Sequence, residues 1–333
     1  MLLSVAFTQI LAARRRIGAH VLRTPQRDAV SLSEKLGVPV RLKCEHHQTT
    51  GSFKLRGATN AVLSLCEGER AAGVVAASTG NHGRALAHAA RIAGCRAVIC
   101  VSKLVPANKV AAIKALGGEV HIVGTSQDDA QVEVDRLVRE EGMSMVPPFD
   151  AVNVIAGQGT LGVEMLEDAP DASAVLVPLS GGGLMAGIAR AVKTINPATQ
   201  LVGVTMEKGA AMHQSLAAKV PVSVTELPTL ADSLGGGIGL SNQHSFAMVR
   251  DLVDQTILVS EAEIANAMRY AYFEEGEVLE GAAAVPLAAL ISGRFAPKGE
   301  VIALLTGKNI DMALHQRIMA GEDPDLEAEA ADA

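Results

Sequence analysis

The stretch GVVAASTGNHGRALAHAARIAGCRAVICVS (residues 73–102) decides the fold class. It opens and closes on runs of β-branched and aliphatic residues, and an alanine-rich segment lies between them. This pattern predicts a strand over 73–78, a helix through 84–87 and a second strand over 95–102. A helix between two strands implies that the strands are parallel and joined by a right-handed crossover.

The same alternation continues along most of the chain. The helix over 106–118 is expected to hold Pro106 in its first turn, and Ser126 is expected to be the N-cap of a later helix. Further apolar runs predict strands over 119–124, 174–180, 200–206, 256–260 and 301–307. We therefore predict an α/β fold of two doubly wound open-sheet lobes that meet at a cleft.

The double proline at 147–148 marks a boundary between the lobes. We predict a large domain formed by residues 1–72 and 150–320, and a small domain formed by residues 73–149. The last residues, 321–333, are acidic and small and include a proline, so we predict a disordered acidic tail there.

Composition excludes several classes of function. The 333 residues contain no tryptophan and only 2 % aromatics, and the net charge is −7, so no nucleic-acid partner is expected. The four cysteines lack CxxC spacing, which argues against a zinc site and a disulfide framework. The basic run at 14–16 follows an apolar start, the reverse of a signal peptide, and no apolar run approaches the roughly 18 residues of a membrane span. The sequence thus predicts a cytoplasmic protein without a membrane partner.

Lys54 lies between Phe53 and Leu55, near the start of an apolar helical pattern. A lysine in such a place is desolvated, which disfavours the ammonium form and lowers the pKa. A neutral lysine amine can form a Schiff base with an aldehyde cofactor and then act as a base. Lys54 is therefore a candidate catalytic residue, although an ordinary lysine on the side of a helix fits the local pattern too.

A glycine-rich segment, SGGGL (180–184), follows a predicted strand and opens a helix. Glycines at that place let backbone N–H groups converge on an anion, and the helix N-terminus adds a favourable dipole. A tight turn without a ligand is the alternative, but three successive glycines cost conformational entropy that a plain turn does not require. We therefore predict a phosphate-binding loop.

The same loop also allows an alternative interpretation, in which the protein is a nicotinamide dehydrogenase. Gly181, Gly183 and Ala186 match the dinucleotide fingerprint, and Glu207 lies near the end of the next strand, where a ribose-binding acid belongs. Against this alternative, the unit comes second in the chain and leaves Lys54 unexplained.

Two more polar loops follow predicted strands. The loop STGNHG (78–83) places hydroxyls, an amide and an imidazole at the carboxyl end of a strand, where open α/β sheets bind ligands. One helix N-cap would need only one such residue, so a binding loop is the better interpretation. In TGKN (306–309), the hydroxyl of Thr306 can hydrogen-bond an unprotonated pyridine-type nitrogen.

Together these motifs resemble the pyridoxal-phosphate enzymes of fold type II, specifically the threonine and serine dehydratase family. The resemblance runs from about Leu22 to Met319 and keeps the family's order of motifs. It implies a tryptophan synthase β-like fold, a pyridoxal 5′-phosphate cofactor and a small amino-acid substrate. We also expect a homodimer.

The resemblance assigns roles to residues of this chain. Lys54 is implied to be the Schiff-base lysine, with Phe53 packed beside it. Asn81 is implied to contact the cofactor's phenolic oxygen, and Thr306 its pyridine nitrogen. The phosphate is implied to bind Ser180, Gly181, Gly182 and Gly183, with Leu184 next to them. The substrate carboxylate is implied to bind the loop of Ser78, Thr79, Gly80, Asn81 and His82.

Within the family, the chain is most similar to the hydroxyectoine-utilization dehydratases, through segments that include 46–65, 78–87, 126–138, 178–184 and 231–240. This likeness implies dehydration of a hydroxylated diaminobutyrate derivative in ectoine degradation, with release of a 2-oxo acid and ammonia. A threonine or serine dehydratase, or a serine racemase, is the alternative. Thr79 occupies the place of a racemase's catalytic serine and is the second candidate catalytic residue.

The sequence departs from the family's pattern at two places. Members with a divalent-cation site carry acids after the strand that corresponds to 200–206, whereas residues 205–211 here retain only the displaced Glu207, so no metal site is expected. Lys308 replaces a common glycine beside the pyridine contact. A catalytically silent protein on the same fold would bind an amino acid without releasing ammonia.

Overall fold

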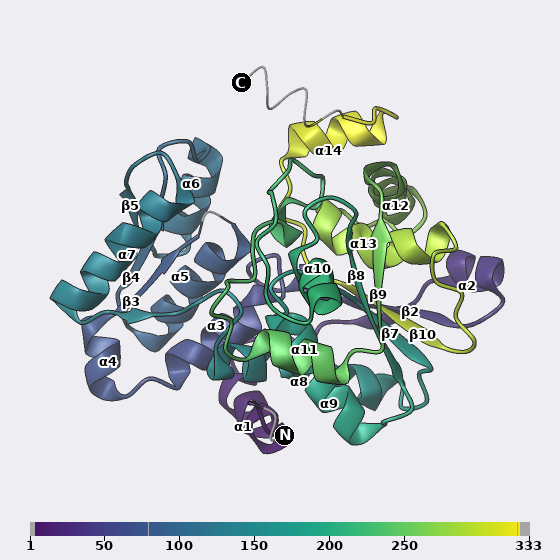
Figure 1. The fold of residues 1–333 in the computed structure, drawn as a ribbon, viewed down its shortest axis with the longest axis horizontal. Helices are drawn as coiled ribbons and strands as arrows, with labels where there is room; N and C mark the ends of the chain where they lie inside the picture. The colour runs from purple at the N-terminus through teal and green to yellow at the C-terminus, as the bar shows by residue number, and fades with distance from the viewer. Residues whose placement is uncertain (1–3, 79, 325, 327–333) are drawn as a thin grey trace.

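Two open β-sheets, each covered by helices on both faces, make up the protein (Figure 1). The computed structural model describes residues 4–78, 80–324 and 326. Within these residues, the predicted α/β class with two doubly wound sheets is confirmed. No helix in the described part of the chain is both long enough and apolar enough to cross a membrane.

The smaller sheet is parallel throughout and has the strand order β5-β4-β3-β6. Its strands are β3 (Val74–Ala77), β4 (Ala97–Val101), β5 (Glu119–Ile122) and β6 (Ser144–Met145). One face packs against α3 (Lys54–Leu63), α5 (Asn81–Ala93) and α6 (Ala107–Ala115), and the other against α7 (Gln127–Glu141). The helix α4 (Glu67–Ala72) leads into β3. Successive residues of each strand point to opposite faces, so the two apolar cores share the strands between them.

The larger sheet has the order β1-β2-β10-β7-β8-β9, and only β1 is antiparallel to its neighbour. Its strands are β1 (Gln26–Asp28), β2 (Val40–Cys44), β7 (Ala174–Pro178), β8 (Gln200–Met206), β9 (Gln255–Val259) and β10 (Val301–Leu305). One face packs against α2 (Val30–Leu36), α12 (Glu261–Phe273), α13 (Gly281–Ile291) and α14 (Met312–Met319). The other packs against α1 (Phe7–Ile17), α8 (Val152–Asp168), α9 (Gly183–Ile195), α10 (Ala211–Ala218) and α11 (Ser245–Leu252).

Local signals predicted most element positions, with one correction. The Ser126 hydroxyl accepts a hydrogen bond from the Asp129 N–H at 3.0 Å, which confirms the N-cap of α7. Pro106 is not in the first turn of α6 but precedes it as the N-cap, because its ψ of 140° is extended and the helix begins at Ala107. Most of the predicted tail over 321–333 lies outside the described residues.

The chain crosses between the two sheets through α3. This helix contributes Ala58, Ala61 and Val62 to a core of the smaller sheet, although it precedes the strands of that sheet. The domain bounds expected from the sequence stay a prediction.

The helix α8 packs closely against both α3 and α9 (Figure 1). A Cβ added at Gly157 would lie 2.7 Å from the Arg56 carbonyl oxygen in α3. A Cβ added at Gly159 would lie 2.9 Å from the Gly187 carbonyl oxygen in α9. Glycine is therefore required at these positions, because the helix backbones touch there without intervening side chains.

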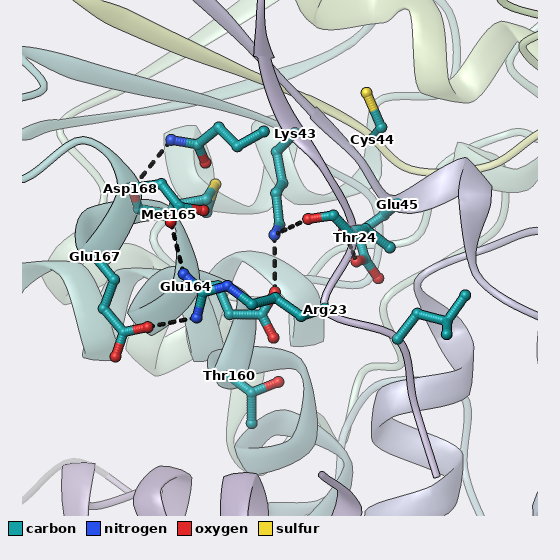
Figure 2. A network of polar contacts seen from close by, with 12 residues as sticks. Arg23, Thr24, Lys43, Cys44, Glu45, Thr160, Glu164, Met165, Glu167 and Asp168 are labelled. Carbon is teal, nitrogen blue, oxygen red and sulfur yellow. Dashed lines mark hydrogen bonds and ion pairs between the residues drawn. The ribbon is translucent and has the colours of Figure 1, made fainter. Parts of the chain in front are cut away.

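A cluster of buried charges, which we call the buried ion network, joins β2, α3 and α8, and Figure 2 shows its members Lys43, Glu45 and Glu164. The Arg56 guanidinium lies 2.6 Å from Glu164 and 2.8 Å from Glu45, and the Lys43 ammonium lies 2.8 Å from Glu164. Lys43 also donates to the Thr24 carbonyl oxygen at 2.8 Å. Two positive and two negative groups thus balance each other inside the protein.

Candidate active site

The candidate active site is a cavity at the carboxyl ends of the strands, in agreement with the general position of ligand sites in open α/β sheets. It gathers segments that are far apart in the sequence, from the start of α3, the start of α5, the loop after β7 and the end of β10. The predicted cofactor residues Phe53, Lys54, Asn81, Ser180, Gly181, Gly182, Gly183, Leu184 and Thr306 all line this cavity. The structure therefore brings together every residue that the sequence predicted to hold the cofactor.

Lys54 is the first residue of α3, and its ammonium group faces the cavity. Its Nζ donates to the Pro148 carbonyl oxygen at 2.8 Å and lies 5.3 Å from the centre of the Phe53 ring. Burial lowers the pKa of Lys54 to about 8, against the opposing charge of Glu280. The amine is thus neutral far more often near neutral pH than an ordinary lysine, as the sequence predicted.

The segment that carries Lys54 is anchored to the end of β10. Ser52 forms an antiparallel bridge with Gly307, and the Phe53 N–H donates to the Thr306 carbonyl oxygen at 3.0 Å. These backbone contacts fix the lysine relative to Thr306, whose buried side chain also lines the cavity.

The glycine segment forms a cradle that side chains would fill. A Cβ added at Gly181 would lie 2.5 Å from the Phe149 ring, and one at Gly182 would lie 2.6 Å from the Met212 methyl carbon. Gly182 also has φ +87°, which side-chain-bearing residues rarely adopt, and α9 begins at Gly183. This arrangement leaves backbone N–H groups at the helix N-terminus available to an anion.

A second layer of contacts, which sequence reasoning missed, supports this cradle. The Ser245 hydroxyl donates to the Gly181 carbonyl oxygen at 2.6 Å. The Asp150 carboxylate in turn accepts the backbone N–H groups of Gln243, His244 and Ser245 at 2.7–3.0 Å. No local motif indicates this support, because Asp150 and the start of α11 are 93 or more positions apart.

Glu280 is the most important residue that the sequence did not reveal. It is buried, and its carboxylate accepts hydrogen bonds from the Asn81 amide at 2.8 and 3.1 Å. Burial raises the pKa of Glu280 to about 7, and the charge of Asp232 adds to this, against donors that include the side chain of Asn81. Its only sequence signal is an acid directly before an apolar helix, which is equally typical of an ordinary helix start.

Asn81 is held in a fixed orientation by two partners. Its Nδ2 donates to Glu280, and its Oδ1 accepts from the Asn309 amide at 2.6 Å. Asn309 is fixed in turn by Arg84, which donates to its Oδ1 at 2.8 Å. The predicted cofactor contact is thus preorganised by side chains from the start of α13 and from the segment after β10.

The structure describes the residues of the predicted substrate loop except Thr79. The Ser78 hydroxyl accepts from the Gly83 N–H at 3.2 Å, and Gly80 is the N-cap of α5. The His82 imidazole contacts the Val146 carbonyl oxygen at 2.8 Å, and burial lowers the pKa of His82 to about 4. Its ring therefore packs in the small-sheet region, and its backbone N–H remains the group suited to a carboxylate. Thr79 lies outside the described residues.

The residues present fit pyridoxal 5′-phosphate. The glycine cradle suits the phosphate, the Lys54 amine suits the aldehyde, and the neutral Thr306 hydroxyl suits the pyridine nitrogen. The dehydrogenase alternative finds no such support, because Glu207 is outside the cavity lining and lies 3.2 Å from Arg294 at an exposed position.

Comparison with known proteins gives matches over nearly the whole chain. A family model described as "Pyridoxal-phosphate dependent enzyme" matches residues 17–307. A protein of Sinorhizobium fredii that bears the provisional name threonine dehydratase is 56 % identical over 319 residues, which cover 96 % of each chain. The L-threonine ammonia-lyase of Geobacter sulfurreducens is 39 % identical over 92 % of this chain and 76 % of its own length. The solved structure of maize serine racemase superposes with a TM-score of 0.90 at 32 % identity, over 96 % of this chain and 98 % of that one.

Proposed function

Because the chain belongs to the pyridoxal-phosphate-dependent enzymes of fold type II, in the threonine dehydratase family, we propose that it removes water from a β-hydroxy amino acid. The observation that carries this proposal is the meeting of the Lys54 amine and the three-glycine cradle in one cavity. Family membership also argues against the alternative of a nicotinamide dehydrogenase, since the family's cofactor is pyridoxal phosphate.

The chemistry divides between the cofactor and the chain. When bound, pyridoxal phosphate supplies an electron sink for the electrons released at the substrate Cα. The Lys54 amine takes the Cα proton onto Nζ, which its lowered pKa of about 8 makes possible near neutral pH. The β-hydroxyl leaves as water and takes up one proton, so no net proton is gained or lost in the elimination.

Other residues orient the substrate and exclude water. The first backbone N–H groups of α5, which begins at Asn81, bind and align the substrate carboxylate. Phe53, Phe149 and Leu234 line the cavity with apolar surface that excludes water. Glu280 keeps the Asn81 side chain in place by accepting a hydrogen bond from its amide.

We further propose that the substrate is a hydroxylated diaminobutyrate derivative. The support is the likeness to hydroxyectoine-utilization dehydratases in segments that include 46–65 and 231–240. Threonine or serine is the second candidate, because the curated relatives carry the names threonine dehydratase and L-threonine ammonia-lyase. A cytoplasmic homodimer is part of the same proposal, and light scattering on the eluting protein tests the dimer.

The test is an absorbance spectrum of the purified protein, followed by ammonia-release assays across β-hydroxy amino acids. We expect a bound-cofactor band, and a kcat/KM for 3-hydroxy-2,4-diaminobutyrate derivatives that exceeds that for threonine by roughly 10–200-fold. Little racemisation of serine is expected. A preference for threonine or serine would overturn the substrate proposal and leave the dehydratase standing. Binding without ammonia release from any substrate would indicate the silent binding protein instead.

A further inference from the structure

A second cluster of reactive side chains lies at the end of β2, away from the cavity lining. Cys44 is the last residue of β2, His46 lies in the short 3₁₀ turn that follows, and Glu277 lies between α12 and α13. Cys44 points to the opposite side of the strand from Lys43 of the buried ion network, as Figure 2 shows. One ligand atom from each of Cys44, His46 and Glu277 lies within 4.8 Å of the other two.

The polar contacts of this cluster leave it incompletely satisfied. A single oxygen of Glu277, Oε2, contacts both the His46 Nε2 at 2.8 Å and the His47 Nε2 at 2.9 Å. The other ring nitrogen of His46, Nδ1, is buried and has no hydrogen-bond partner among the residues that the structure describes, and the His46 side chain is only 1 % exposed. Buried polar groups are normally paired, so an imidazole that keeps one ring nitrogen unpaired, in a cluster with a thiol and a carboxylate, requires an explanation.

We propose that this cluster is a zinc site, with Cys44, His46, His47 and Glu277 as its four ligands. One sulfur, two imidazoles and one carboxylate form a set that suits Zn²⁺, whereas Mg²⁺ and Ca²⁺ prefer oxygen ligands alone. Tetrahedral zinc places neighbouring ligand atoms about 3.5 Å apart. One ligand atom from each of Cys44, His46 and Glu277 lies within 4.8 Å of the other two, and the His47 Nε2 joins them at 2.9 Å from Glu277 Oε2, so the side chains must rotate to reach that spacing.

The charges around the cluster are compatible with a divalent cation. Binding releases the thiol proton, and each imidazole coordinates in its neutral form through one nitrogen. The Cys44 thiolate and the Glu277 carboxylate then match the two charges of the ion. Arg27 is the nearby cation, at 3.2 Å from Glu277 Oε1, and its charge is offset by Glu275 at 2.6 Å.

The zinc would act as a structural clamp, because four protein ligands leave no open position for a substrate. It would join the end of β2 to the segment before α13, and Glu277 is only three residues before Glu280. No local motif indicates this site, because its ligands come from two segments far apart in the chain and combine three kinds of side chain.

The experiment is a zinc titration of the chelator-treated, dialysed holoenzyme against a chromophoric competitor, with metal analysis and thermal unfolding. We expect one Zn²⁺ per chain and a Tm that rises with zinc concentration. Cys44→Ser, which preserves the side-chain volume, should weaken zinc binding at least tenfold. Cys66→Ser is the matched control, because Cys66 is exposed and outside the cluster, and it should bind like the wild type.

Two further measurements keep the test decisive if Cys44→Ser does not fold. His47→Ala alters a side chain that is 38 % exposed, so it should keep the metal-free Tm and lose zinc affinity. Co²⁺ in place of Zn²⁺ should give a thiolate charge-transfer absorption in the wild type and in Cys66→Ser. The absence of stoichiometric zinc, unchanged affinity in His47→Ala, or loss of that absorption in Cys66→Ser would each overturn the proposal.

Discussion

The protein buries charged groups in two regions, and it treats them in opposite ways. In the buried ion network, Arg56 touches both Glu45 and Glu164, and Lys43 touches Glu164. In the active site, the charge of Glu280 acts on the pKa of Lys54, yet the two groups bind other partners. The amine donates to a backbone carbonyl, and the carboxylate accepts from an amide.

The two arrangements have opposite effects on protonation. In the network, burial alone would raise the pKa of Glu164, but the charges of Arg56 and Lys43 outweigh it and the pKa falls. In the active site burial prevails, so the pKa of Lys54 falls to about 8 and that of Glu280 rises to about 7. Direct ion pairing therefore keeps the groups of the network charged, and they serve the structure. Without a direct ion pair, Lys54 and Glu280 can exchange protons near neutral pH.

The largest effect is expected when the unpaired amine is removed. Lys54→Ala should lower kcat by more than about 10³-fold, because the base and the cofactor attachment are lost together. The exposed Lys35→Ala is the control and should keep full activity. After borohydride reduction, peptide mapping should find the cofactor on Lys54 in the wild type, and a label on another lysine would refute the assignment.

Breaking the paired region should cost stability instead. Glu164→Gln leaves Lys43 and Arg56 with one carboxylate between them, and we expect the free energy of unfolding to fall by about 3–5 kcal/mol. Glu119→Gln is the matched control, because its pair with Arg96 at 2.9 Å is exposed, and it should change stability by no more than about 1 kcal/mol. Denaturant unfolding at neutral pH measures both, and equal losses would contradict the contrast between the regions.

The proton on Glu280 predicts a pH dependence of the cofactor-free protein. Between about pH 4.5 and pH 7, the folded protein keeps a proton on Glu280 that the unfolded chain has lost. The free energy of unfolding should therefore fall as pH rises through this window, by no more than about 3 kcal/mol from this group. Glu280→Gln should remove that part of the pH dependence, and the exposed Glu34→Gln should keep it. Identical pH profiles for the wild type and Glu280→Gln would contradict the prediction.

The smallest effect is expected from adding an unpaired charge to the site. Gly182→Asp places a carboxylate against the phosphate and a side chain at φ +87°, so cofactor binding should weaken by about 1–3 kcal/mol. Gly182→Ala separates the backbone contribution from the charge and should weaken binding less. Unchanged affinity of both variants in an absorbance titration would place the phosphate elsewhere.

Prediction from the sequence succeeded where the signal was local. Hydrophobic alternation predicted strands such as β8 over 200–206. The glycines after β7 line the same cavity as Lys54, while phosphate binding there stays a prediction. The positions of Lys54 and Thr306 in one cavity also follow from the rule that ligands bind at the carboxyl ends of parallel strands.

Prediction failed where a role depends on a distant partner. Glu280 and Asp150 look like ordinary surface acids in the sequence, because their partners Asn81 and Ser245 are far away along the chain. The buried ion network was missed for the same reason. Arg56 gives no local sign of the carboxylate that holds it from α8, 108 positions later.

The glycine contacts along α8 have a consequence for the dimensions of the active site. Lys54 begins α3 and the cradle begins α9, and both helices rest on α8 backbone to backbone at Gly157 and Gly159. At these two glycines, backbone contacts rather than side chains set how closely α3 and α9 approach α8, and with them the separation between the amine and the cradle. Adding even one methyl group at either glycine would push a helix away from α8. That shift would move Lys54 relative to the glycine cradle.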